Sequence, residues 1–175
     1  DERAAEARKL QPAAAAAGGS IYHVRSMLLN DMHTDEPVVL PERVDAELGA
    51  WLRALPWPVA VVIHANHANE FDASVDGALL RLREAGATVL NQAVLLRGVN
   101  DSVDALTALS ERGFAAGALP YYLHQLDRVA GAAHFEVDDN TALALHAALM
   151  ARLSGYLVPK LVREVAGDPG KRPLP

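Results

Sequence analysis

The stretch Val59-Ala60-Val61-Val62-Ile63, followed directly by His64-Ala65-Asn66-His67, decides the fold that the sequence predicts. A continuous apolar run rich in β-branched residues is typical of a strand buried on both faces, as strands of parallel sheets are. The apolar residues between 44 and 55 recur on one face of a helix, and Pro56 ends that helix. The sequence therefore predicts a helix followed by a strand that ends in polar side chains.

The same unit recurs toward the C-terminus. Apolar stripes predict helices over 75–85, 103–114 and 143–153, and apolar runs predict strands over 87–90, 119–123 and 157–162. Alternation of helix and strand with short connections predicts an α/β fold of parallel strands covered by helices. A closed eight-stranded barrel needs about 200 residues or more. The 175 residues of this chain therefore predict an open sheet or a part of a barrel.

The two ends of the chain are less regular. Residues 1–20 are rich in alanine without an apolar stripe, and they predict a mobile tail or a poorly packed helix. The segments 21–24 and 37–40 are each compatible with a short strand. The segment 167–173 holds two glycines and two prolines, and it is predicted to be irregular.

Polar residues follow three of the predicted strands: His64, Asn66 and His67; Asn91 and Gln92; and His124, Gln125 and Asp127. Ligands of α/β folds bind at the carboxyl ends of parallel strands, so these residues predict the place of a site. His64 and His67 have H-x-x-H spacing, but they follow a strand and no third metal ligand is obvious. Contact with a ligand or structural hydrogen bonding is therefore favoured over a metal site.

Composition excludes several function classes. The chain has no cysteine, so it forms no disulfide, thiolate zinc site or cysteine-ligated iron–sulfur cluster. Its net charge of −6 argues against non-specific binding of nucleic acid, which needs a basic surface. No apolar run is long enough to span a membrane, and no signal-peptide core follows the charged first residues. A soluble protein of the cytoplasm is expected.

Two groups of residues in the C-terminal part of the chain are candidates for binding a cofactor or a substrate. Lys171 lies in a glycine- and proline-rich segment and is a candidate for a Schiff base with an aldehyde cofactor, or else an ordinary lysine of a solvated tail. Asp127 and Glu164 follow predicted strands, where carboxylates can bind a substrate ammonium group or simply cap a helix or face water. In the loop before residue 103, Asn100 or Asp101 is a candidate helix N-cap.

Several ordered strings resemble the lysine 2,3-aminomutase family of radical S-adenosylmethionine enzymes. They are Val62 to Glu70, Asn91 to Asp101, Pro120 to Asp127, Leu153 to Pro159 and Gly170 to Leu174. The resemblance covers residues 37–175, and the His64-Ala65-Asn66-His67 string favours the EpmB branch, which makes β-lysine for attachment to elongation factor P. It implies the C-terminal portion of an incomplete (β/α) barrel whose N-terminal strands are missing, preceded by an aberrant or low-complexity segment 1–36.

The resemblance also implies roles for single residues. Lys171 matches the lysine that binds pyridoxal phosphate, Asp127 an acidic residue that binds the substrate ammonium, and Glu164 its acidic partner, where the family often has Asp. His64 and Gln92 match positions near S-adenosylmethionine. The implied substrate is lysine, free or carried on elongation factor P, whose amino group moves from C2 to C3. No metal ligand is assigned in this chain.

The chain departs from the family in one decisive feature. The C-x-x-x-C-x-x-C motif that ligates the family's [4Fe–4S] cluster has no counterpart, because the sequence holds no cysteine. The sequence therefore predicts no aminomutase turnover by the isolated chain. The alternatives are a truncated, non-catalytic fragment that at most binds pyridoxal phosphate, and an unrelated phosphate-binding α/β domain. Exposed apolar surface predicts self-association or a complementing N-terminal fragment as partner.

Overall fold

The computed structural model describes residues 22–24, 41–127, 131–165 and 170–174. In these residues a single six-stranded sheet has its strands in chain order. The strands are β1 (Tyr22–Val24), β2 (Val59–His64), β3 (Ala87–Leu95), β4 (Ala118–Gln125), β5 (Lys160–Arg163) and β6 (Arg172–Pro173). Strands β1 to β5 are parallel, and β6 pairs with β5 in the antiparallel direction.

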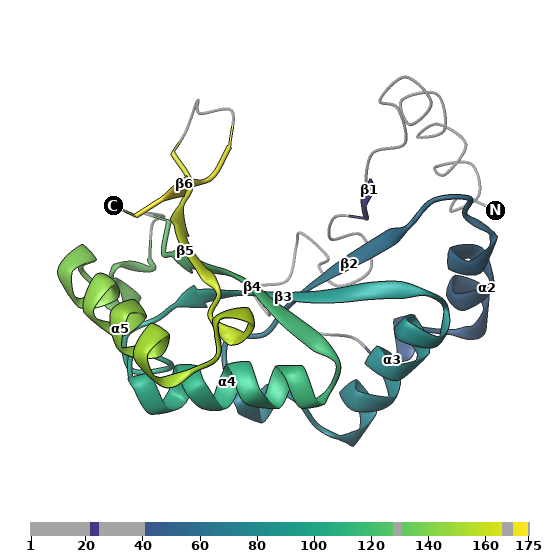
Figure 1. Cartoon of the computed structure of the whole chain (residues 1–175), viewed down its shortest axis with the longest axis horizontal. Coiled ribbons are helices and arrows are strands. Elements are labelled where there is room, and N and C mark those ends of the chain that lie inside the picture. The colour runs from purple at the N-terminus through teal and green to yellow at the C-terminus, as the bar shows by residue number, and fades with distance from the viewer. Residues whose placement is uncertain (1–21, 25–40, 128–130, 166–169, 175) are drawn as a thin grey trace.

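Four α-helices are described, and each precedes a strand: α2 (Ala46–Ala54), α3 (Ala73–Glu84), α4 (Val103–Ala115) and α5 (Asp139–Arg152). Short 3-10 turns lie at Pro41–Arg43 (η1), Ala68–Glu70 (η2), Ala133–Phe135 (η3) and Gly155–Leu157 (η4). Helix α3 packs on β3 and α4 packs on β4, both on the same side of the sheet (Figure 1). Among the described helices, none has the length and apolar content needed to cross a bilayer.

Capping side chains explain where the helices begin. Asp72 and Asp138 accept hydrogen bonds from backbone N–H groups in the first turns of α3 and α5. A hydrogen bond from a neighbouring hydroxyl, that of Ser74 or Thr141, lowers the pKa of each carboxyl group most, and the backbone bonds lower it further. The prediction for α4 was wrong, because its N-cap is Ser102, whose hydroxyl accepts from the Ala105 N–H at 3.2 Å.

The core lies between the helices and one face of the sheet. Its largest side chains are at most 2% exposed: Leu48, Leu79 and Leu82 from the helices, and Ile63, Leu95 and Leu123 from the strands. The other face of β3 and β4 is only half buried, since Gln92, Tyr122 and His124 keep part of their surface accessible. The strand predicted over 59–63 to be buried on both faces is so at the centre of β2, whereas β3 and β4 have partly exposed residues along one face.

The predicted α/β class with parallel strands is confirmed. A strand order that follows the chain order is the order found in (β/α) barrels. Strand β3 extends beyond the predicted 87–90 to Leu95, and the predicted strand 157–162 begins instead at Lys160, after the turn η4. The short strand predicted at 21–24 is present as β1, whereas residues 1–20 and the candidate strand 37–40 lie outside the described residues.

The C-terminal segment corrects the sequence prediction most clearly. Residues 167–173 were expected to be irregular, but Arg172 and Pro173 form β6 against Arg163 and Val162 of β5. Proline is compatible with this position because β6 is an edge strand, where its missing N–H leaves no partner unsatisfied. The N–H of Leu174 extends the pairing by donating to the Leu161 carbonyl at 3.2 Å. The pairing fixes the residue just before β6, which is Lys171.

Candidate functional site

A row of polar side chains crosses the half-buried face of the sheet. The strand registers pair His64 with Gln92, Gln92 with Tyr122, and Tyr122 with Lys160. Paired residues in adjacent strands point to the same face of a sheet. Four strands therefore present one polar residue each along a single line, opposite the face that the helices cover.

The first two members of this row contact each other. The Nε2 atoms of Gln92 and His64 are 2.8 Å apart, and the Gln92 amide donates to the imidazole nitrogen. The sequence predicts both residues near S-adenosylmethionine, and the structure brings them together at the end of β2 and in the middle of β3. Both side chains are partly exposed on the face away from the helices.

A bulge in β4 shapes the middle of the row. The register between β3 and β4 shifts so that Asn91 pairs with Pro120 while Gln92 pairs with Tyr122, which leaves Tyr121 as the extra residue. The rings of Tyr121 and Tyr122 lie 3.9 Å apart between centroids, and their hydroxyl oxygens are 3.2 Å apart. The hydrogen bond to Tyr122, aided by burial, raises the pKa of Tyr121 above its usual value.

Lys171 lies at the end of this row, held by three side chains from two other strands. Its ammonium forms an ion pair with Glu164, which follows β5. The Lys171 Nζ is also 3.3 Å from Nε2 of His124 and 5.4 Å from the centre of the Tyr122 ring. The Lys171 side chain is 25% exposed. We call Lys171, Glu164, His124 and Tyr122 the lysine cluster. These contacts argue against the alternative interpretation of the sequence, in which Lys171 is an ordinary lysine of a solvated tail.

The structure separates the two carboxylates that the sequence grouped. Glu164 belongs to the lysine cluster, whereas Asp127 is exposed two residues beyond the end of β4. In the part of the chain that the structure describes, the contacts of Lys171 involve Glu164 and not Asp127. Sequence reasoning missed Tyr122 and the pairing of His124 with Lys171. The i, i+2 spacing of Tyr122 and His124 on one strand was the signal that they share a face.

The asparagines at the strand ends have a structural role instead of a ligand-binding one. Asn91 exchanges two hydrogen bonds with the backbone of Ala65, at 2.9 and 3.0 Å. Asn66 accepts from the Val94 N–H at 2.7 Å, and its own N–H donates to Glu70. These amides satisfy backbone groups of the loops that follow β2 and β3. They fix those loops beside His64 and Gln92.

Asn100 joins the two loops and is fully buried. Its Oδ1 accepts from the Leu96 N–H at 2.7 Å, and its Nδ2 donates to the carbonyls of Asn66 and Val94, each at 2.8 Å. One side chain thus satisfies three backbone groups, in the loop after β2, at the end of β3 and in the loop after β3, so its removal would leave all three without these partners. This explains the position of Asn100 better than the helix-capping role that the sequence suggested.

We expect Asn100→Ala to lower the free energy of unfolding by roughly 2–4 kcal/mol, because three part-buried backbone groups lose their partner. Urea denaturation followed by circular dichroism measures this. Asn140→Ala is the matched control, since Asn140 is exposed on α5 and should change stability by less than about 0.5 kcal/mol. Equal effects of the two variants would show that the Asn100 bonds do not hold the loops.

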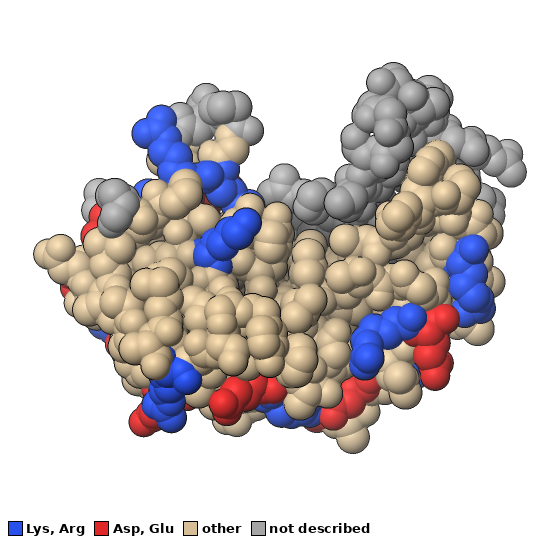
Figure 2. Space-filling model, in the orientation of Figure 1, with Lys and Arg blue, Asp and Glu red and all other residues tan. Residues whose placement is uncertain are grey.

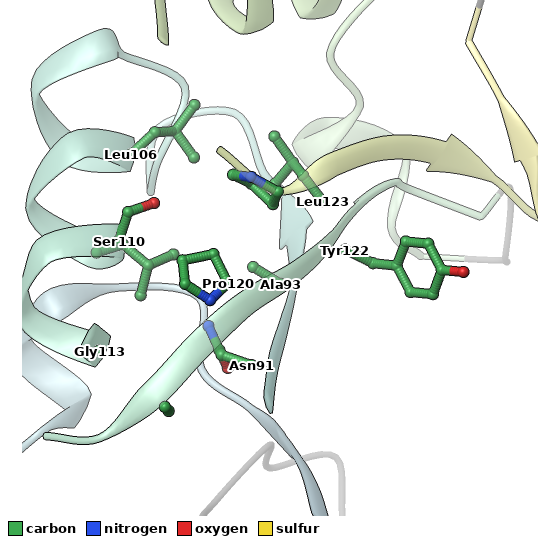
Figure 3. A pocket seen from close by; sticks show the side chains of 11 residues that line it. Asn91, Ala93, Leu106, Ser110, Gly113, Pro120, Tyr122 and Leu123 are labelled. Atoms are coloured by element: carbon green, nitrogen blue, oxygen red, sulfur yellow. The ribbon is translucent and has the colours of Figure 1, made fainter. Parts of the chain in front are cut away.

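A narrow crevice between β3, β4 and α4 shares only Tyr122 with the lysine cluster. Its lining is largely apolar, with Leu106, Ser110 and Gly113 from the helix facing Ala93 and Pro120 from the strands (Figure 3). The Tyr122 side chain contributes to its rim but points away from the helix (Figure 3). The crevice lies on the helix side of the sheet, so we interpret it as a packing gap and not as the binding site.

Basic residues accompany the lysine cluster. Lys160, Arg163, Lys171 and Arg172 all belong to or adjoin β5 and β6, and Figure 2 shows blue side chains gathered there. Arg163 pairs with Asp139 of α5, which raises the pKa of its guanidinium. An aldehyde cofactor with a phosphate requires a primary amine to bond its aldehyde and positive charge near its phosphate. The amine of Lys171, next to the Tyr122 ring and surrounded by basic residues, meets both requirements. The residues therefore fit pyridoxal phosphate.

The residues do not fit an iron–sulfur cluster. The chain has no cysteine thiolate, and among the described residues no group of three or more His, Asp or Glu side chains is arranged to hold a metal. His67 of the H-x-x-H pair accepts from the Asn69 N–H at 3.2 Å and caps η2. That bond gives His67 a structural role.

Comparison with known proteins identifies relatives of one kind. The chain is 44% identical over 155 residues to "L-lysine 2,3-aminomutase" of Escherichia coli (strain K12). The aligned region covers 89% of this chain and 44% of that protein. It is 46% identical over 140 residues to the protein of the same name from Haemophilus influenzae, covering 80% and 41%. For that of Clostridium subterminale the identity is 37% over 138 residues, covering 79% and 33%.

The matches are partial with respect to these relatives. The chain spans less than half the length of each of the three. No family model matches the sequence. Among solved structures, a radical SAM methyltransferase from Sphaerobacter thermophilus is similar, with a TM-score of 0.47 and 20% identity over 67% of this chain and 37% of that one.

Proposed function

Since the chain is homologous to the lysine 2,3-aminomutase family over most of its length, we propose that it forms the part of an aminomutase that binds pyridoxal phosphate and lysine. The observation that carries this proposal is the lysine cluster. Lys171 matches the family's cofactor lysine in sequence, and its Nζ is held beside His124, Glu164 and Tyr122 on the open face of the sheet. Residues 37–175 are the proposed extent of this part.

Each residue of the cluster has a definite task in this proposal. The Lys171 amine binds the cofactor aldehyde, and the Tyr122 ring bounds the space beside Nζ. When bound, pyridoxal phosphate supplies an electron sink next to the substrate carbon that carries the amino group. Lys160, Arg163 and Arg172 provide positive charge around β5 and β6 for its phosphate. His64 and Gln92 are proposed to contact S-adenosylmethionine.

Glu164 is the proposed binding group for the substrate side-chain ammonium, with Asp127 as a second carboxylate. The geometry supports Glu164 directly, because this carboxylate already binds a lysine ammonium, that of Lys171. Once the Lys171 nitrogen is bonded to the cofactor, it no longer forms a full ion pair with Glu164. The carboxylate then becomes available for the substrate, so the cofactor should bind before lysine.

The lineage supports migration of the amino group from C2 to C3, and the resemblance to the elongation factor P branch makes that factor the proposed destination of the β-lysine. The residues of this chain support no step through an iron–sulfur cluster, because no thiolate is present to ligate one. That same absence favours a second candidate function. In it, the chain binds pyridoxal phosphate but does not turn over lysine.

A fusion distinguishes the two candidates. We expect a polypeptide bearing the family's C-x-x-x-C-x-x-C motif, fused to the N-terminus of this chain, to form β-lysine anaerobically from lysine and S-adenosylmethionine. The same fusion with Lys171→Ala should form none, because the cofactor lysine is lost. Amino-acid chromatography measures the product, and iron content confirms the cluster. A fusion that holds the cluster and pyridoxal phosphate but forms no β-lysine would favour the binding-only function.

A further inference from the structure

The surroundings of Lys171 pose a problem for its proposed chemistry. A lysine amine attacks an aldehyde only when its nitrogen has a free lone pair, so the ammonium must first lose a proton. In the ion pair with Glu164 the Lys171 amine is present as an ammonium. A side chain close to Nζ that accepts one of its protons would assist the attack.

His124 meets this requirement by geometry. Its Nε2 lies 3.3 Å from Lys171 Nζ, although the two residues are 47 positions apart in sequence. A lysine ammonium has three N–H donors and no acceptor, so in this contact the imidazole nitrogen is the acceptor. We therefore assign the lone pair to Nε2 of His124 and the ring proton to Nδ1, since hydrogen positions are inferred from the hydrogen-bond partners. An imidazole in this form can take a proton near neutral pH.

We propose that His124 is the general base that takes a proton from Lys171 as its amine adds to the cofactor aldehyde. The inference rests on the proposed function. The ammonium transfers one proton to Nε2 of His124, and the freed lone pair of Nζ forms a bond to the aldehyde carbon. The aldehyde oxygen leaves as water with that proton, returned by His124, and a second from Nζ. The third Nζ proton stays on the new C=N bond, so atoms and charge balance.

The groups that face His124 set the direction of the pH dependence. Tyr122 on the same strand packs edge-on against the imidazole at 5.6 Å, while Lys171 and Glu164 approach from the C-terminal segment and from beyond β5. Tyr121 and Lys160 lie beside Tyr122, the latter in register with it. A protonated imidazole accepts no proton, so the rate of bond formation should fall at acidic pH, where imidazole groups are charged.

The test is the rate at which the chain bonds pyridoxal phosphate, followed by stopped-flow absorbance between pH 5 and 9. We expect His124→Gln to react about 100-fold more slowly near neutral pH, since glutamine keeps polar contacts but accepts no proton. Its rate should rise steadily up to pH 9 as the lysine amine itself loses a proton, whereas the rate of the parent chain should level off. His134→Gln is the matched control, because His134 is exposed near Phe135, and it should match the parent chain.

A second variant, His124→Ala, distinguishes loss of the base from misfolding of the chain. We expect free imidazole to accelerate His124→Ala in proportion to its basic form, which a purely structural role would not allow. A parent-like rate and pH profile in His124→Gln, while Lys171→Ala forms no bond, would overturn the role of His124 and leave the proposed function intact. Failure of the parent chain itself to form the bond would overturn both.

Discussion

Lys171→Ala is expected to abolish covalent binding of pyridoxal phosphate. The parent chain should develop the absorbance band of a C=N bond when the cofactor is titrated, and the variant should show only free cofactor. The reason is that Lys171 combines partial burial with two neighbours, Glu164, which orients its amine, and His124, the proposed base. An alanine at this position removes the nitrogen itself, so the loss should be complete instead of graded.

Lys160→Ala provides the control for this experiment. Lys160 is exposed on β5, in register with Tyr122, and thus carries an amine in the same region without the contacts of Lys171. We expect it to keep the band, with a weaker affinity if its charge assists the phosphate. A band that survives in Lys171→Ala and disappears in Lys160→Ala would show that Lys160, and not Lys171, binds the cofactor.

The second large effect concerns iron. After anaerobic reconstitution with iron and sulfide, followed by desalting, we expect the chain to retain no [4Fe–4S] cluster and to form no β-lysine with S-adenosylmethionine and lysine. Clusters of this kind are held by cysteine thiolates, and the chain has none. Assays of iron and acid-labile sulfide, together with the visible absorbance, measure the outcome.

A relative that carries the cluster motif, reconstituted in parallel, shows that the procedure works. Iron and sulfide retained by this chain at cluster stoichiometry would contradict the prediction and would imply ligands other than cysteine. Iron that washes out on desalting, with full incorporation in the relative, would agree with it. The result bears on this chain alone and is independent of whether Lys171 binds pyridoxal phosphate.

The architecture was predictable from local patterns. The apolar run 59–63 and its successors alternate with helical stripes, and this alternation alone predicts parallel strands. Asp72 and Asp138 were recognisable as caps because a capping carboxylate acts within three residues of its own position. These features depend on short-range chemistry, which the sequence displays directly.

The parts that were missed depend on contacts between distant residues. Strand β6 exists because a short segment reaches β5, and the glycines and prolines of 167–173 carry no sign of that pairing. Asn91 and Asn100 looked like residues for ligands or caps, but their amides satisfy backbone groups of neighbouring loops. Whether an amide faces a ligand or a carbonyl is decided by tertiary structure.

The candidate site was predictable in its members but not in its arrangement. Resemblance pointed to Lys171 and Glu164, while the structure adds His124 and Tyr122 and sets Asp127 apart, exposed beyond β4. The bulge at Tyr121, which places two phenols side by side, has no signature in the spacing of Pro120, Tyr121 and Tyr122. Such features appear only when neighbouring strands are aligned.

The central claim is that the pairing of β6 with β5 presents Lys171 as the cofactor lysine. The most direct measurement is to treat the chain with pyridoxal phosphate, reduce it with borohydride, and map the modified residue by peptide mass spectrometry. The sequence has three lysines, Lys9, Lys160 and Lys171, so the assignment is unambiguous. The account predicts one pyridoxyl group, on Lys171. Modification spread evenly over the three lysines, or confined to Lys9 or Lys160, would contradict it.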